Sequence, residues 1–227
     1  MISNTDGYIM SIWKQPDWTS NDIIKYLKPF IRPLKVGHAG TLDPFAEGIL
    51  VLCVGKMTKS VSLMMDCEKE YIVNIIFGKR TDTLDLTGKI TKIKECKPLK
   101  LNNIKSVLEL FKGETYQIPP MFSALRQKGK RLYTLARKGI SVKREPRKII
   151  IHNIELISHN DFSIKIKVIC GKGTYIRSLA RDIGHKLDTE AYVESLIRTR
   201  VGSYDKKASI GAEDFKVWLQ SQQDIQS

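Results

Sequence analysis

The sequence predicts an α+β protein with a mixed, mainly antiparallel sheet flanked by helices and loops. Apolar and polar residues alternate with the period of a strand in three segments, Tyr71–Phe77, Lys148–Leu156 and Phe162–Cys170. Apolar residues recur with helical spacing in three others, 23–27, 103–111 and 174–187. Because hairpin connections join strands to strands, this pattern favours α+β over a regularly alternating βαβ fold.

The elements follow in order along the N-terminal part of the chain. Tyr8–Trp13 reads as a strand, and Thr19–Asp22 offers N-caps for the helix through Leu27. The apolar run Gly48–Gly55 is typical of a short buried strand. The Tyr71–Phe77 strand ends at Gly78, and a polar turn at 81–88 precedes a further strand at 89–94.

The C-terminal half combines a basic segment with a hairpin and a helix. The helix at 103–111 stops at Gly113, after which the chain becomes irregular and basic. The two strands of 148–170 are joined by the turn Ser158–Asp161, and a helix with an apolar face follows. We expect one main domain at 1–204, with a basic insertion at about 120–148, and a short tail at 205–227 that forms no separate domain.

The charge of the chain points to a polyanionic partner. Lys and Arg number 38 against 24 Asp and Glu, a net charge of +14. Clustered cations favour nucleic acid through counterion release, whereas a general basic bias for solubility would spread them evenly. Between Arg126 and Lys148 there are ten Lys or Arg and one acid, Glu145, which favours an RNA or DNA groove.

Neither the cysteines nor the N-terminus indicates an exported or metal-binding protein. The four cysteines are widely spaced, without a C-x-x-C pair or a nearby histidine cluster, so neither a disulfide framework nor a metal site is expected. Residues 1–6 lack the pattern of a signal peptide, and no run approaches the roughly 20 apolar residues of a membrane span. We therefore expect a cytoplasmic protein without membrane attachment.

A glycine-punctuated turn, Gly37–Pro44, carries the candidate nucleophile Asp43. Gly37 and Gly40 permit unusual backbone conformations, and Pro44 fixes the backbone after the acid. The buried strand that follows would anchor this turn, as a preorganised site requires. Asp43 could also be a simple turn cap, the commonest task of an aspartate before proline.

A second glycine turn, Gly171–Gly173, precedes Arg177 at the start of a helix. A guanidinium here could pair with a carboxylate and hold it ionised, and Asp43 is the candidate partner. The turn could instead cradle a phosphate, but it lacks the length and spacing of a nucleotide-binding loop.

Several segments together resemble the TruB family of RNA pseudouridine synthases. In order and spacing the likeness covers roughly residues 8 to 204. The matching motifs are Gly37–Pro44, Lys69–Tyr71, Gly78–Thr83 with Asp85 and Gly88, Ile118–Ala124, Gly171–Arg177 and Leu196–Gly202. The resemblance implies the pseudouridine synthase catalytic fold. It also implies a tRNA pseudouridine synthase, an isomerase acting on the T-arm uridine conventionally numbered 55, without metal or other cofactor.

The resemblance also assigns roles to residues of this chain. Asp43 matches the nucleophile, Tyr71 the tyrosine that stacks on the target base, and Arg177 the arginine paired with the aspartate. The positions that contact RNA or line the uracil pocket are matched by His38, Tyr175 and Leu196. The target uridine lies in a folded T loop and must be flipped out, and the basic insertion matches the segment that grips RNA. Whether the carboxylate attacks C1′, assists a glycal intermediate or adds to the ring stays open.

The chain departs from the family pattern at two places. Asp17 stands where the family's Lys-Pro-x-Gly motif has glycine, and the residues after Tyr204 leave no room for the PUA-type RNA-binding domain of many bacterial relatives. RNA affinity would then rest on the catalytic domain, and we expect a monomer.

Two functions of other classes compete with this interpretation. A catalytically idle RNA-binding protein would use the same groove, although Asp43, Tyr71 and Arg177 argue against it. A glycosidase would need a second carboxylate near Asp43, for which Glu47 and Glu70 are candidates. The positive charge makes a neutral sugar a less natural substrate.

Overall fold

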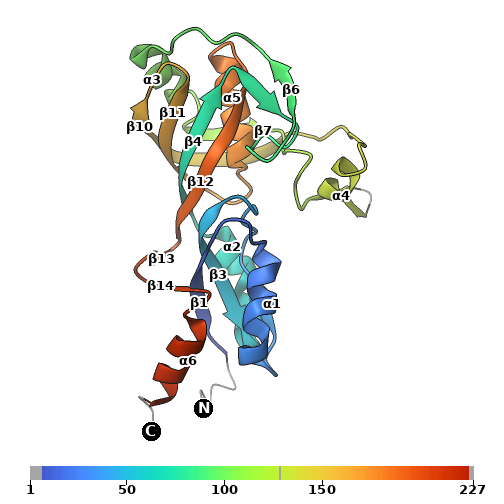
Figure 1. Cartoon of the computed structure of the whole chain (residues 1–227), viewed down its shortest axis with the longest axis vertical. Helices are drawn as coiled ribbons and strands as arrows, with labels where there is room; N and C mark the ends of the chain where they lie inside the picture. The colour runs from blue at the N-terminus through green and yellow to red at the C-terminus, as the bar shows by residue number, and fades with distance from the viewer. Residues whose placement is uncertain (1–6, 128, 225–227) are drawn as a thin grey trace. The chain divides into compact units, whose positions relative to one another are not determined.

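The computed structural model describes residues 7–127 and 129–224, with side chains placed as far as residue 220. The chain forms two compact units, which we call unit 1 (residues 1–70 and 197–227) and unit 2 (residues 71–196). Two strands, β4 (Lys69–Phe77) and β12 (Ala191–Val201), carry the chain from one unit to the other (Figure 1). Each unit is built from strands and helices, so the predicted α+β class is confirmed.

Unit 1 is a sheet covered by helices. Its strands lie in the order β14-β1-β3-β12, with β2 also paired to β3 and β13 to β12. β1 and β3 are antiparallel, with Ile12 opposite Leu50, whereas β12 runs parallel to β3 and β14 parallel to β1. The elements not yet given are β1 (Ile9–Lys14), α1 (Ser20–Ile31), β2 (Val36–His38), β3 (Glu47–Val54), η1 (Gly55–Ser60), α2 (Val61–Asp66), β13 (Tyr204–Asp205), β14 (Ser209–Gly211) and α6 (Phe215–Asp224).

Strand β3 is apolar from Ile49 to Val54 because both of its faces are covered there. On one face, Leu50 and Leu52 pack with Ile23 and Leu27 of α1 and with Phe215 of α6. On the other face, residues 49 and 51 pack with Ala39 and Val201. A strand buried on both sides gives an unbroken apolar run rather than an alternating one, as the sequence predicted for 48–55.

Helix α1 begins where the sequence predicted a cap. The Thr19 hydroxyl accepts from the backbone N–H of Asp22, and the Asp22 carboxylate accepts in return from the N–H of Thr19. This capping box satisfies two otherwise unpaired donors at the helix start. Ser20, Ile23, Leu27 and Ile31 form the buried face of the helix.

In unit 2 the strands of the ten-stranded sheet follow in the order β12-β4-β11-β10-β7. β4 alternates buried and half-buried residues along its length, and β10 and β11 form the predicted antiparallel hairpin. Its further elements are β5 (Lys79–Thr81), β6 (Ile90–Ile93), α3 (Leu101–Glu109), β7 (Gly113–Gln117), β8 (Arg126–Gln127), β9 (Lys130–Arg131), α4 (Leu132–Ala136), β10 (Arg147–His159), β11 (Ser163–Cys170) and α5 (Ile176–Lys186).

The basic insertion is more ordered than the sequence indicated. It contains the short hairpin β8–β9 and the helix α4, followed by a stretch without regular structure up to Arg147. Leu132 anchors α4 by being buried, whereas nearly all of the cations around it are exposed. Lys128, one of the ten cations of this segment, lies outside the described residues.

The close approach of β3 and β12 requires glycine at position 48. Gly48 has a φ of +116°, and a Cβ there would lie 2.2 Å from the carbonyl oxygen of Arg198. Gly48→Ala should therefore lower the free energy of unfolding by about 3 kcal/mol or more, through backbone strain together with separation of the two strands.

Urea denaturation followed by circular dichroism measures this effect. The matched control is Gly113→Ala, which shares a positive φ of +89° but has no atom within 4 Å of the added Cβ. Its cost should be about 1–2 kcal/mol from strain alone. Equal losses in the two variants would contradict the close-approach argument.

Candidate active site

Asp43 lies half-buried on the loop between β2 and β3, in unit 1. Its carbonyl accepts from the N–H of Ala46, which closes a tight turn around Pro44. The preceding residue, Leu42, is buried, and the Ser20 hydroxyl bonds both its backbone N–H (2.9 Å) and its carbonyl (3.2 Å). The first residue of α1 thus fixes the turn from one side.

A buried arginine, Arg198 of β12, holds the same turn from another side. Its Nε donates to the carbonyl of Ile49 at 2.7 Å, and its two terminal nitrogens donate to the carbonyls of Thr41 (3.4 Å) and Gly40 (3.2 Å). Gly40 has a φ of +98°, a conformation that glycine adopts readily. One guanidinium therefore joins the strand β3 to the backbone just before Asp43.

A buried lysine, Lys14 at the end of β1, holds the backbone just after Asp43. Its Nζ donates to the carbonyls of Gln15 (2.8 Å) and Pro44 (3.1 Å). Burial lowers the pKa of Lys14 to about 8, with the nearby Asp43 carboxylate opposing the shift and Arg198 adding to it. Asp43 is therefore the carboxylate whose charge most favours the protonated lysine.

His38, the other predicted unit 1 residue, lies at the end of β2. Its Nδ1 is buried and has no hydrogen-bond partner within the described part of the chain. Burial first, and then the charge of Arg198, lower the pKa of His38, so the imidazole is neutral at pH 7. A neutral ring with a vacant ring nitrogen suits contact with a polar ligand better than it suits acid catalysis.

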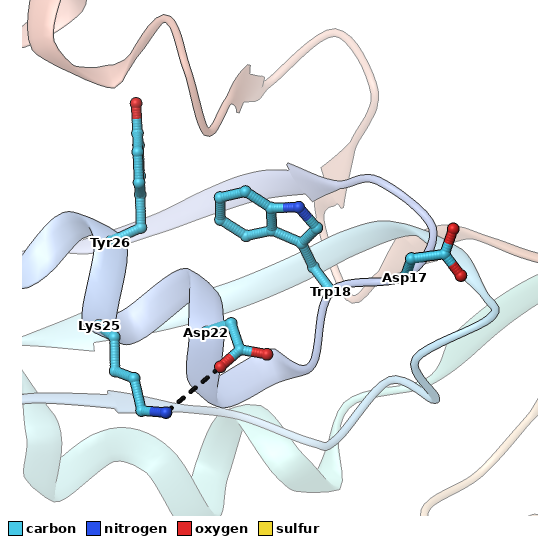
Figure 2. Close-up of a pocket in the computed structure, with 5 residues that line it drawn as sticks. All are labelled: Asp17, Trp18, Asp22, Lys25 and Tyr26. Atoms are coloured by element: carbon cyan, nitrogen blue, oxygen red, sulfur yellow. Dashed lines mark hydrogen bonds and ion pairs between the residues drawn. The ribbon is translucent and has the colours of Figure 1, made fainter.

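Asp17, where the chain departs from the family's glycine, lines a cavity of about 280 Å³. Figure 2 shows the residues that line it. The Asp17 N–H donates to the carbonyl of Pro44 at 2.8 Å, with a φ of +66°, so the aspartate adopts a conformation usual for glycine. Trp18 and Tyr26 meet edge to face beside the ion pair of Asp22 with Lys25. The backbone contact to the Asp43 turn is thus made although Asp17 stands in place of glycine.

Arg177, in unit 2, is buried in a cage of oxygen atoms. One terminal nitrogen donates to the carbonyl of Thr83 at 2.7 Å and lies 3.4 Å from the Asp85 carboxylate, and the other donates to the carbonyl of Phe122 at 2.8 Å. Asp85 in turn accepts from the hydroxyls of Thr83 and Thr87. The motif segments around 83–87 and 118–124 therefore position this arginine.

Tyr175 lies directly before α5, so it shares the start of that helix with Arg177. The N–H of Tyr175 donates to the side-chain oxygen of Gln117, and the Ser178 hydroxyl donates to the carbonyl of Ile118. These contacts tie the helix start to the end of β7. The side chain of Tyr175 is half-buried.

Tyr71 and Leu196 lie on the neighbouring strands β4 and β12. Tyr71 is 8% exposed and shares the buried face of β4 with Val73 and Ile75, and Leu196 is 5% exposed. Unit 2 thus contains Tyr71, Tyr175, Arg177 and Leu196, and unit 1 contains His38 and Asp43. The predicted pairing of Asp43 with Arg177 would join the two units and stays a prediction.

Comparison with known proteins decides the family. The N-terminal domain of TruB family pseudouridylate synthases matches residues 28–176, and the C-terminal domain of tRNA pseudouridylate synthase B matches residues 177–226. This chain belongs to the TruB family. The family predicted from the sequence motifs is confirmed, and with it the assignment to the pseudouridine synthase class of isomerases.

Curated relatives of this TruB family member match most of its length. The "tRNA pseudouridine synthase B" of Clostridium tetani (strain Massachusetts / E88) is 45% identical over 91% of this chain and 71% of the relative. The protein of the same name from Phocaeicola vulgatus is 40% identical over 96% of this chain and 95% of the relative.

Solved structures show the same fold. The "Crystal Structure of a Cbf5-Nop10-Gar1 Complex" contains a chain that is 26% identical with a TM-score of 0.71, covering 96% of this chain and 57% of that one. A chain of the "Structure of H/ACA RNP bound to a substrate RNA containing 2'-deoxyuridine" is 23% identical with a TM-score of 0.69. The match covers 96% of this chain and 56% of that one. The TruB chain thus spans a little over half of each solved chain. The predicted pseudouridine synthase fold is confirmed.

No helix among the described residues is long and apolar enough to cross a membrane. Within the same residues, no group of three or more His, Cys, Asp or Glu side chains is arranged to hold a metal ion.

The sequence interpretation did not assign roles to Lys14, Arg198 and Asp85. Arg198 and Asp85 lie within motifs that resemble the family, and Lys14 is the first residue of the motif in which Asp17 replaces glycine. The motifs therefore contained these residues but did not indicate their roles. A charged residue directly after two apolar ones, as in Ile12–Lys14 or Leu196–Arg198, was the available signal.

Lys14→Met should flatten the pH dependence of stability. The pKa of Lys14 is about 8 in the folded protein against 10.5 for an exposed lysine. Between pH 8 and pH 10.5, Lys14 therefore carries its proton more often in the unfolded chain than in the folded one. Its contribution to stability is therefore least favourable below pH 8 and improves as the pH rises toward 10.5. The unfolding free energy of the wild type relative to the variant should rise by about 2 kcal/mol from pH 7.5 to 10.

Denaturant titrations at several pH values measure this difference. Lys105→Met, at an exposed position of α3, provides the baseline. If wild type and Lys14→Met have parallel pH profiles, Lys14 does not lose its proton in this range.

Asp85→Asn should strongly destabilise the chain, because it removes the buried carboxylate charge that lies 3.4 Å from the Arg177 guanidinium. We expect a loss of about 3 kcal/mol in unfolding free energy. Thermal and urea unfolding measure it, with Asp82→Asn as the control, since Asp82 is exposed and accepts one backbone N–H, from Lys89. The control should lose about 1 kcal/mol or less, and equal losses would rule out a special role for the buried pair.

Proposed function

We propose that this chain converts the T-arm uridine at position 55 of tRNA to pseudouridine, with Asp43 as the nucleophile and with the target base flipped out of the RNA. The observation that carries the proposal is the clamped Asp43 turn, whose backbone is bonded by Ser20, Arg198 and Lys14. A carboxylate held in one place can approach the sugar of a bound uridine without first losing conformational freedom. The names of the curated relatives support tRNA as the substrate.

The reaction is an isomerisation within one nucleoside. The bond from C1′ to N1 breaks, the uracil turns, C1′ bonds to C5, the C5 proton leaves and N1 takes up a proton. The Asp43 carboxylate attacks C1′, or removes the C2′ proton to give a glycal and returns it when C1′ bonds to C5, or adds to the uracil ring and leaves again. Each route needs an ionised carboxylate close to the target nucleoside. Electrons balance without an oxidant, and the proposal includes neither a metal nor another cofactor.

The remaining site residues bind and orient the substrate. Tyr71 stacks on the target uracil, which repays part of the few kcal/mol that base flipping costs. Arg177, fixed by Asp85 and two carbonyls, presents its charge to the Asp43 carboxylate. His38, Tyr175 and Leu196 contact the RNA or line the uracil pocket, and a neutral His38 serves in positioning rather than in proton transfer.

RNA affinity comes from the basic surface of the chain. The net charge of +14 draws the phosphate backbone, and the insertion at about 120–148 grips it. We further propose that the chain acts in the cytoplasm as a monomer, through a catalytic domain at 1–204 with 205–227 as an appended segment. β14 and Phe215 of that segment pack into unit 1.

The two competing functions lack a supporting observation. A glycosidase needs a second free carboxylate, but Glu70 accepts from the Thr199 hydroxyl at 2.8 Å and lies 3.9 Å from Arg200. An idle RNA-binding protein would have no need of a clamped aspartate.

Asp43→Asn should abolish turnover, by at least about a thousandfold, because an amide cannot act as the nucleophile. It should keep tRNA affinity within a few-fold. Purified protein is incubated with unmodified tRNA transcript without added metal, and pseudouridine is mapped by carbodiimide treatment and reverse transcription.

The control is Asp161→Asn, at an exposed position in the turn between β10 and β11, which should be fully active. Release of free uracil would indicate a glycosidase, and tight binding without any pseudouridine would indicate an RNA-binding protein. Appreciable turnover by Asp43→Asn would show that Asp43 is not the nucleophile.

A further inference from the structure

The cavity of about 280 Å³ in unit 1 combines aromatic rings with carboxylates. Trp18 packs against the buried cluster that includes Ile23 and Leu27, so its ring is held in place by the core. The proposed function assigns no task to this cavity. Its lining residues, from the start of α1 and the turn before it, are Asp17, Trp18, Asp22, Lys25 and Tyr26 (Figure 2).

The cavity has the opposite charge to the chain that contains it. Its two aspartates and one lysine leave a net charge of −1, whereas the whole chain carries +14. At physiological salt the Debye length is about 8 Å, so a bound ion responds mainly to the charges next to it. Hydrogen bonds from Thr19 lower the pKa of Asp22, so this carboxylate is ionised at pH 7. The cavity therefore favours a cation over a polyanion.

The aromatic rings offer a cation a second kind of contact. Trp18 and Tyr26 meet at 73° with their centroids 5.4 Å apart, so they form two walls of a corner. Lys206 places its ammonium 4.7 Å from the centre of the Trp13 ring, but within the described residues no lysine or arginine is placed in this way over Trp18. An indole face attracts an ammonium group within about 6 Å. The Trp18 ring is thus open to a cation from outside the chain.

The two carboxylates lie on different sides of the Trp18 ring (Figure 2). One oxygen of Asp22 accepts from the N–H and the hydroxyl of Thr19, at 3.1 and 2.6 Å, and the other lies 3.4 Å from the Nζ of Lys25. With 70% of its side chain exposed, Lys25 is a weakly held partner. Another ammonium group can therefore take its place.

Asp17 is the carboxylate on which a cation should mainly depend. The N-terminus of α1 carries a partial positive charge, which opposes a cation and which Asp22, in the first turn, partly offsets. Asp17 lies outside the helix, and its side chain forms no ion pair within residues 7–127 and 129–224. Its backbone is fixed, because its N–H donates to the carbonyl of Pro44 at 2.8 Å.

We propose that this cavity binds a linear alkyl diamine, free or as the end of a longer polyamine, with its methylene chain across the Trp18 ring. One ammonium group pairs with Asp17, and the other displaces Lys25 from Asp22. Charge-assisted hydrogen bonds to two carboxylates and the contact with the indole supply the affinity. The site is separate from the proposed function and does not depend on it.

The test is a titration of the whole protein with putrescine, followed through the indole N–H signals of its three tryptophans in ¹⁵N-resolved NMR. The Trp18 signal, identified by its absence from Trp18→Phe, should shift and saturate with a Kd on the order of 1 mM. The signal of Trp13, whose ring already faces Lys206, should stay in place. Shifts of all three signals without saturation would overturn the proposal.

A monoamine tests the need for two carboxylates. n-Butylamine has the methylene chain of putrescine but one ammonium group, so it should bind about 5-fold more weakly. Equal affinities for the two amines would contradict a site built for a diamine.

Two variants at Asp17 remove its carboxylate and leave the turn intact. Asp17 has a φ of +66°, which asparagine tolerates and glycine, the residue of the family pattern, adopts readily. Asp17→Asn and Asp17→Gly should each weaken putrescine binding about 5-fold, and thermal unfolding checks that both keep the fold. The control Glu213→Gln, at an exposed acid of unit 1, should change Kd by less than about 2-fold. An unchanged Kd in both Asp17 variants would sink the proposal.

Lys25→Gln distinguishes a cationic ligand from an anionic one. Removal of the ammonium that competes for Asp22 should tighten putrescine binding about 3-fold, whereas an anion would lose affinity. Uridine monophosphate is the anionic probe and should leave the Trp18 signal in place. A saturable shift with uridine monophosphate, or weaker putrescine binding to Lys25→Gln, would refute the diamine site. These titrations involve no turnover, so their result and that of the pseudouridine assay stand separately.

Discussion

The Asp43 turn depends on two cations that are removed from water. The backbone carbonyls on either side of Asp43 point inward, toward the Arg198 guanidinium and the Lys14 ammonium. Burying a charge is expensive unless hydrogen bonds compensate it, and five carbonyl oxygens do so here. The same bonds fix the loop, the end of β1 and the pairing of β12 with β3. Loss of either cation would therefore affect the loop and the sheet together.

Much of the fold was predictable because local patterns agree with the final packing. The alternation in Tyr71–Phe77 and the cap at Thr19 both predicted the elements observed. The strand β12 was missed, because exposed Glu194 and Ser195 break its alternation and Arg198 is a charged residue at a buried position. α6 was missed because its burial is contributed largely by Phe215, which needs unit 1 to pack against.

The sequence predicted the candidate site residues but not the residues that hold them in place. The motif resemblance identified Asp43, Tyr71 and Arg177 as candidates, whereas the contacts that fix them come from residues distant in sequence. Asp85 reaches Arg177 across 92 positions by residue number, and Arg198 reaches Gly40 across 158. The local periodicity of apolar residues does not predict contacts between residues so far apart in the sequence.

The long reach of Arg198 has a consequence during synthesis. The Asp43 turn is among the first fifth of the chain to leave the ribosome, but the guanidinium that bonds Gly40, Thr41 and Ile49 is added about 150 residues later. At 5–20 residues per second this delay is about 8 to 30 s. Throughout that time the loop of the candidate nucleophile lacks the hydrogen bonds from Arg198 and has those from Lys14 and Ser20. The basic segment at 126–148 is therefore synthesised before the contacts that fix the Asp43 turn are complete.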